Sequence, residues 1–389
     1  MNQEPHARGA LAHPVWLLAT TLALATLGCS SEDEHSGPVD VQISGEEAAT
    51  DGFLYPSGSE VSFVDGWELR FSHLLVTVDD LTLAENPDAA PTDQSRTGAL
   101  VARASGPWAV DLVVPGSVPG AGGEGLATPL TRITRMNLRG NEAFAPDERY
   151  AFGYRLVRAT AAAEHVNFAD ADVEALYARM IERGDAVLYV GTATFKGEDC
   201  ASSDPDYDFE SLPKSIAFEL GFATPTHYVN CQNQENQGAA FEGEEYQRGV
   251  AIPSNRPAIA QITLHVEHPF FSDTVHDSPV FFDQMAAQLV GAKPNSTLTL
   301  EHFEHVDPTA FADGAGTPLP WRACLADAEL PAGKQRHFGV GHVLVDPSGD
   351  PHQVFRDYRD YASYLQSTQG HLNGGEGLCY VERAYPSPP

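Results

Sequence analysis

The amino-acid sequence predicts a mainly β protein, with an antiparallel β-sandwich domain followed by a second mixed, mainly β region that contains a few short helices. Apolar and polar residues alternate along several short segments, which is typical of half-buried strands. The 34 Gly and 28 Pro residues supply turns between these segments. Only three segments have the apolar spacing of a helix. Strands are therefore expected to form most of the core.

The clearest strand candidate covers residues 67–83, where Leu69, Phe71, His73 and Leu75 alternate with other residues. This placement predicts that His73 is a histidine of the core or its rim. The other strand candidates are residues 60–64, 108–114, 130–138, 150–159, 186–195, 215–223, 227–232 and 258–266.

Three helices are expected, near residues 170–183, 282–290 and 353–365. The first has the strongest signals, because Asp170 can cap its N-terminus and Gly184 can end it. Together with the strands, these helices predict four parts of the chain. They are a lipoprotein signal peptide at 1–28, an acidic flexible tether at 29–50, a β-sandwich domain at 51–160 and a mainly β domain at 161–389.

The signal peptide is predicted from an apolar, uncharged run at residues 14–28, which is too short to span a membrane comfortably. Gly28 and Cys29 at its end resemble the lipobox of bacterial lipoproteins, in which the cysteine carries acyl chains. Ser30 after the cysteine is associated with sorting to the outer membrane in such proteins. We therefore expect lipidation at Cys29 and attachment to the bacterial cell envelope. The alternative is an ordinary signal peptide cleaved near Ala25, which would leave Cys29 free.

The charge balance argues against binding to nucleic acid and against electrostatic docking to anionic lipid. The chain has 23 Lys and Arg residues against 54 Asp and Glu residues, a formal net charge of −31. Nucleic-acid binding by a basic surface needs the opposite excess, and so does electrostatic docking to anionic lipid. The expected membrane contact is therefore the N-terminal lipid alone, and no nucleic-acid partner is expected.

Four further cysteines support export, because an even number in an exported chain favours disulfides. They are Cys200, Cys231, Cys324 and Cys379. Three pairings are possible, and we favour Cys200 with Cys231 and Cys324 with Cys379, because each closes a loop within one region. The alternative, a thiolate metal site, lacks any CxxC spacing.

A cluster of imidazole and carboxylate side chains follows the strand candidate 258–266. It contains His265, Glu267 and His268, and Asp273, His276 and Asp277 come shortly after. Imidazole nitrogen is a preferred ligand of zinc and copper, so a Zn or Cu site is predicted here. The alternative is a polar loop of an acidic protein.

A second segment near the C-terminus presents His371 in a Gly-rich loop before Cys379. We predict that His265, His268 and His371 converge on one metal ion. Glu267 is then either a fourth ligand or the acceptor of an imidazole N–H.

Two sequence blocks, HVEHPFF at 265–271 and GHLNGGEGLC at 370–379, resemble a group of uncharacterised bacterial lipoproteins of the myxobacterial type. The similarity extends to the DGW at 65–67 and the strand after it, in scattered blocks over about a third of the chain. Glu267 stands where those proteins have Asp. The resemblance implies an exported lipoprotein with a histidine site, and it implies no activity.

Weaker candidates are His302 and His305, which could supply further ligands, and the acidic segment 204–210, which could bind calcium. Phe209 stands where an EF-hand needs Gly. The sequence has no GxSxG, P-loop or GxGxxG motif and no Cys/His nucleophile pair.

Three classes of function remain. The first is a lipid-anchored exported protein that binds Cu or Zn through its histidines. The second is a cell-surface interaction or structural module without a small-molecule site. The third is a metal-dependent hydrolase with Glu267 or Asp273 as general base. Because no motif names a reaction, an enzyme is the less favoured interpretation.

Overall fold

The computed structural model describes most of the chain after residue 36. The described ranges are 37–56, 61–122, 125–140, 142–275, 277–326, 328–338, 355 and 357–383. The predicted signal peptide, Cys29 and His276 lie outside them. Among the described residues, no helix is long and apolar enough to cross a membrane.

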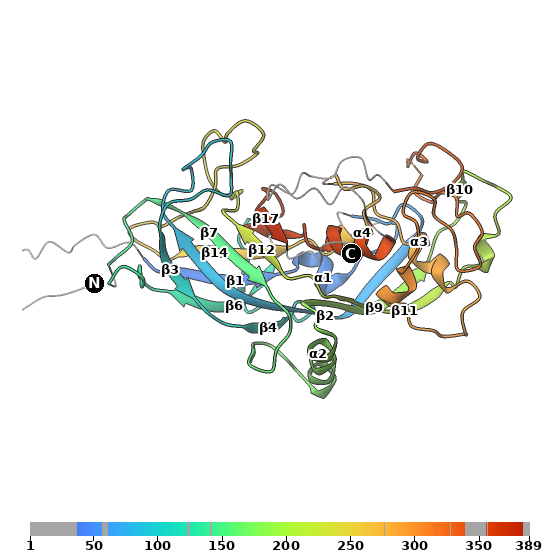
Figure 1. Ribbon diagram of the computed structural model, residues 1–389, viewed down its shortest axis with the longest axis horizontal. Coiled ribbons are helices and arrows are strands. Elements are labelled where there is room, and N and C mark those ends of the chain that lie inside the picture. The colour runs from blue at the N-terminus through green and yellow to red at the C-terminus, as the bar shows by residue number, and fades with distance from the viewer. Residues whose placement is uncertain are drawn as a thin grey trace, which may run out of the picture. The chain divides into compact units, whose positions relative to one another are not determined.

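The fold is mainly β, as the sequence predicts, and its larger sheet has ten strands (Figure 1). The order along the main path is β11-β9-β2-β7-β12-β17, with β3 and β4 beside β2, β8 beside β4 and β13 beside β7. The strands of the main path are β2 (Trp67–Ala84), β7 (Arg149–Leu156), β9 (Val187–Phe195), β11 (Ser215–Phe222), β12 (Thr226–Val229) and β17 (Tyr380–Arg383). The others are β3 (Leu100–Ala104), β4 (Trp108–Asp111), β8 (Glu164–His165) and β13 (Val250–Ala251).

The second sheet has five strands in the order β16-β14-β1-β6-β5. They are β16 (Gly370–Leu372), β14 (Ala258–Leu264), β1 (Val39–Ser44), β6 (Leu126–Ile133) and β5 (Val118–Pro119). β1 pairs in parallel with β14 and antiparallel with β6, so this sheet is mixed. A small third sheet joins β10 (Ala201–Ser202) to β15 (Arg322–Ala323).

The prediction of a flexible tether up to residue 50 is wrong for its last part. Residues 39–44 form β1, and α1 (Glu46–Asp51) follows directly. Val39, Val41 and Ile43 are buried in the main core. Burial of this apolar row fixes the segment in the sheet, despite its acidic neighbours.

Apolar side chains from both large sheets belong to one buried cluster, which includes Val41 of β1, Ile262 of β14 and Phe152 of β7. Strands from both sides of residue 160 also share the larger sheet, because β2 pairs directly with β9. Residues from Glu34 onward form one compact unit. The predicted sandwich and C-terminal regions thus meet within that unit.

Every strand candidate except 60–64 overlaps an observed strand. Residues 61–64 instead lead into a turn, in which the Gly66 N–H donates to the Phe63 carbonyl. The Gly residue supplies the positive φ of 87° that this turn contains.

The helix at 170–183 is confirmed as α2 (Ala171–Arg183), and Asp170 caps it by accepting from two backbone N–H groups. Its apolar face packs with Leu75 and Leu188 in a second cluster. The helix at 282–290 is α3 (Asp283–Ala286), continued by the 3₁₀ turn Ala287–Leu289. The third, α4 (Tyr358–Gln366), begins later than expected, because Asp357 caps it. The remaining 3₁₀ turns are Phe209–Ser211, His268–Phe270 and Leu300–Phe303.

All four predicted cysteines form disulfides, but the favoured pairing is wrong. Cys200 is bonded to Cys324, and Cys231 to Cys379. The reason is strand pairing: β12 and β17 lie antiparallel, with Val229 opposite Tyr380, so Cys231 and Cys379 meet at their ends. β10 and β15 bring Cys200 and Cys324 together in the same way. The two disulfides indicate an oxidising, extracytoplasmic compartment.

A buried ionic network joins α3 to the loop before β2. Asp283, with no exposed side-chain surface, receives two N–H bonds from Arg322 and one from Trp67 Nε1 at 2.8 Å. Arg336 lies 3.5 Å from Asp283 and 3.7 Å from Asp65. Asp65 accepts the backbone N–H groups of Phe282 and Asp283. Burial, and then the charge of Asp283, raise the pKa of Asp65 well above its ordinary value.

Candidate metal centre

The site forms where β14 ends and the chain turns. The His265 N–H donates to the Gln369 carbonyl at 2.9 Å, and His268 begins the 3₁₀ turn with Pro269. β16 lies antiparallel to β14, with His371 opposite Thr263. The sheet register therefore brings together histidines from two distant segments, as the sequence predicts.

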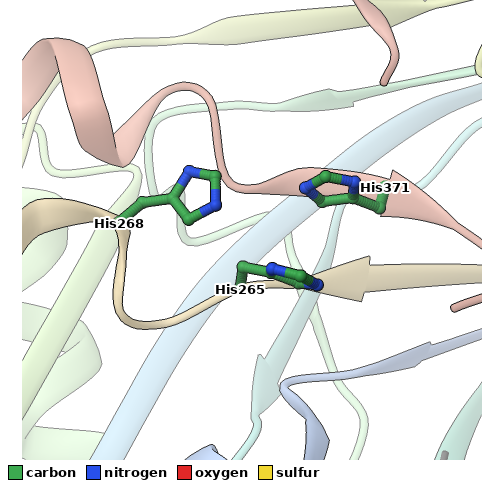
Figure 2. A group of neighbouring side chains, drawn as sticks. All are labelled: His265, His268 and His371. Atoms are coloured by element: carbon green, nitrogen blue, oxygen red, sulfur yellow. The ribbon is translucent and has the colours of Figure 1, made fainter. Parts of the chain in front are cut away.

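Figure 2 shows the three rings around one small space. One possible ligand atom from each of His265, His268 and His371 lies within 4.8 Å of the other two. The rings of His265 and His371 are stacked, with centroids 4.3 Å apart, and both His265 and His371 meet the His268 ring edge-on. His265 is 9% exposed, His268 1% and His371 0%, so the group is largely shielded from bulk solvent.

Two of the rings have a defined tautomer. Thr368 Oγ1 donates its proton to the Leu365 carbonyl, so at 2.7 Å it accepts from His268 Nδ1–H. The Gly377 carbonyl, 3.2 Å from His371 Nδ1, can only accept a proton. Both imidazoles, when neutral, therefore carry the proton on Nδ1 and a lone pair on Nε2, through which an imidazole can bind a metal.

His265 lies between two carboxylates. Glu267 Oε1 is 3.2 Å from its Nδ1, and Glu46 Oε1 is 2.9 Å from its Nε2. Burial lowers the pKa of His265, but the charges of Glu267 and Glu46 outweigh it and raise that pKa well above its ordinary value. The site therefore favours positive charge, whether a proton or a metal ion.

The sequence prediction missed Glu46, because it fell in the presumed tether. A signal was present, since the alternation of Val39, Val41 and Ile43 predicts a strand that ends next to Glu46. Glu46 begins α1 and has a φ of 59°, which is uncommon for a residue with a side chain.

The Gly-rich loop after β16 covers the contact between His265 and Glu46. A Cβ atom on Gly375 would lie 2.7 Å from His265 Nε2 and 3.3 Å from Glu46 Oε1, so no larger residue fits without a shift. The disulfide at Cys379 closes the loop. The sequence predicts that a crosslinked loop presents His371, and this geometry agrees.

Three imidazoles give a donor set that could hold a metal ion, and the Glu267 carboxylate lies beside one of them. An ion lies in the plane of each imidazole that binds it. The stacked rings of His265 and His371, whose planes are 27° apart, would therefore have to tilt apart to share one ion.

The weaker candidates have other partners. His302 Nδ1 caps its own 3₁₀ turn at Thr299. His73 lies 2.7 Å from Asp111. In the acidic segment, Asp204 and Asp208 accept backbone N–H groups of their own loop. None of these residues joins the three-histidine group.

Comparison with protein-family models, with curated proteins and with solved structures found no match for this chain. The resemblance to myxobacterial lipoproteins therefore stays a prediction. The argument for function rests on the residues of the site.

Proposed function

We propose that this protein is an exported, lipid-anchored protein that binds one Zn²⁺ or Cu²⁺ ion through His265, His268 and His371. The observation that carries the proposal is the convergence of three imidazole ligand atoms within 4.8 Å. Metal sites of this kind are built from neutral imidazoles whose second nitrogen is held by a protein acceptor. His268 and His371 have such acceptors in Thr368 and the Gly377 carbonyl.

The donor atoms favour a borderline divalent ion. Imidazole nitrogen suits zinc and copper, whereas Cu⁺ favours thiolate and thioether ligands. Cys200, Cys231, Cys324 and Cys379 are all held in disulfides, so they supply no thiolate. Glu267, 7% exposed and next to His265, provides a carboxylate as fourth ligand or as acceptor of an N–H.

The burial of the site favours binding over hydrolysis. A catalytic zinc keeps a coordination position that is open to water and substrate. His268 and His371 are almost completely buried, which suits a closed site instead. The interaction-module alternative differs from the proposal in one measurable respect, because it requires no metal.

Metal analysis tests the proposal directly. Protein produced in an oxidising compartment should bind about one Zn²⁺ or Cu²⁺ per chain. A ligand present at 100 times its dissociation constant stabilises the folded state by about 2.7 kcal/mol, so a chelator should lower the melting temperature. In His371→Ala, affinity should fall by more than about 100-fold, since loss of a ligand's outer partner alone costs about 10–100-fold. Isothermal titration calorimetry would measure the number of ions bound per chain and the affinity.

His165→Ala is the matched control, because His165 pairs with Glu174 on the surface, away from the group. Its affinity and its response to chelator should equal those of the wild type. If the wild-type protein binds neither ion, the metal proposal fails and the interaction module is favoured. If His371→Ala binds as well as the wild type, the proposed ligand set is wrong.

Membrane attachment is a separate part of the proposal, based on the lipobox-like sequence at Cys29 and on the oxidising compartment that the disulfides indicate. We expect a fatty-acid analogue to label the wild type in a bacterial host and not Cys29→Ser. The substituted protein should move from the membrane to the soluble fraction, because acyl chains provide the anchor. Equal labelling of both proteins, or of neither, would disprove lipidation at this residue.

A further inference from the structure

We infer that Glu46 is a positioning residue of the metal centre: with Oε1 2.9 Å from Nε2 of His265, it would accept the Nε2–H when this histidine binds the ion through Nδ1, while His268 and His371 bind through Nε2. The inference rests on the proposed metal binding. It assigns a role to a residue of the segment 29–50, which the sequence analysis predicts to be a flexible tether.

The first step concerns the two nitrogens of His265. Glu46 Oε1 lies 2.9 Å from Nε2, the atom at the far end of the ring. In Figure 2 that end points away from His268, whereas the His371 ring extends towards His268. The ligand atom that His265 can share with both other rings is therefore Nδ1.

The second step concerns the atom next to Nδ1. Glu267 Oε1 lies 3.2 Å from it. Two ligands of a tetrahedral zinc, each bonded at about 2.0–2.1 Å, are separated by roughly 3.3 Å. A carboxylate oxygen at this distance is within reach of an Nδ1–H, and it would stand as a neighbouring ligand if an ion replaced the proton on Nδ1.

The third step concerns how Glu46 is held. It follows β1 and begins α1 with a positive φ of 59°, an unfavourable conformation that persists only where surrounding structure maintains it. Its side chain is 17% exposed, and the backbone of Gly375 passes directly over its contact with His265. Its neighbour Glu47 is exposed and takes no part in the contact.

Two variants of Glu46 separate charge from hydrogen bonding. Gln retains a carbonyl acceptor for Nε2–H without the charge, whereas Ala has neither. The expected order of Zn²⁺ affinity is wild type, then Glu46→Gln, then Glu46→Ala, with a total loss of about 10–100-fold. Glu47→Ala is the control and should bind like the wild type. The melting temperature in chelator checks that each variant is folded.

Two spectroscopic measurements report on the role itself. In Zn²⁺-loaded protein, long-range ¹H–¹⁵N spectra should identify Nδ1 of His265 and Nε2 of the other two histidines as metal-bound. With Co²⁺ in place of zinc, the visible d–d spectrum of Glu46→Gln should match the wild type, because the ligands themselves are unchanged.

Each opposite result overturns the inference. The first is a metal-bound Nε2 in His265. The second is a changed d–d spectrum in Glu46→Gln, which would make Glu46 a ligand. The third is a Zn²⁺ affinity of Glu46→Ala equal to that of the wild type. These results are distinct from failure of the proposed function, in which the wild type and Glu47→Ala would bind neither Zn²⁺ nor Co²⁺.

Discussion

Replacing Asp283 by Asn should lower the free energy of unfolding by about 3–5 kcal/mol, because it removes the anion that two buried guanidinium groups share. Arg322 donates two hydrogen bonds to this carboxylate, and Arg336 lies 3.5 Å from it. An amide keeps the shape but not the charge, and one of its terminal groups becomes a donor facing Arg322. Urea unfolding at neutral pH would measure the loss of stability, provided that the free energy of unfolding depends on urea concentration with the same slope in both proteins.

Asp65→Asn is the matched control within the same network. Asp65 accepts two backbone N–H groups through one oxygen, a role that an amide oxygen can retain. Burial raises its pKa, so the folded state holds the Asp65 proton to higher pH than the unfolded state does. The stability from this proton is complete below the unfolded pKa of about 4 and declines as the pH rises through the folded value.

The Asn side chain of Asp65→Asn does not titrate, whereas the wild type loses stability as Asp65 loses its proton. The stability of the variant relative to the wild type should therefore increase as the pH rises above about 4. We expect it to lose much less than Asp283→Asn at neutral pH. Equal losses in the two variants would show that Asp283 is not the principal anion of the network. An unchanged difference from pH 4 to 7 would show that Asp65 does not bind a proton in the folded state.

The second large effect is expected from the disulfides. Cys231 and Cys379 are separated by 148 residues, and Cys200 and Cys324 by 124. On the chain-entropy account, a crosslink of this span stabilises the fold by about 4–5 kcal/mol. The double variants Cys231→Ser/Cys379→Ser and Cys200→Ser/Cys324→Ser should therefore lose similar amounts in denaturant unfolding without reductant.

The two double variants should differ at the metal centre. Cys379 closes the loop that contains Gly375 and follows His371, so its loss should also weaken Zn²⁺ binding. Cys200 and Cys324 join β10 to β15, which contain no residue of the three-histidine group, so their loss should leave affinity unchanged in folded protein. Equal affinities in the two variants would contradict a role of the loop crosslink in the site. Non-reducing peptide mapping would check the pairing itself.

Local patterns were sufficient for most of the fold. The alternation along 67–83 predicts β2, and Asp170 with Gly184 predicts the ends of α2. Such signals depend on neighbouring residues alone. The disulfide pairing depends on which strands meet, and proximity in sequence does not determine that. Cys231 meets Cys379 only because β12 pairs with β17.

The histidine group could be predicted in part for the same reason. His265 and His268 lie at a strand end marked by Pro269, and His371 lies in a loop marked by glycines. Their convergence needs the pairing of β14 with β16, which these local signals do not indicate. The alternation before Glu46 indicates a strand, but only the parallel pairing of β1 with β14 shows that this strand brings Glu46 to the site.

The parallel pairing of β1 with β14 also sets an order of assembly. During synthesis or export β1 emerges early, whereas Ala258, the partner of Val39, follows much later. Without β14, β1 would have antiparallel β6 on one side and an unpaired edge on the other. A chain interrupted before residue 258 would leave the apolar row of Val39, Val41 and Ile43 without its partner strand. On this argument we expect completion of the five-stranded sheet, and with it the meeting of Glu46 and His265, late in folding.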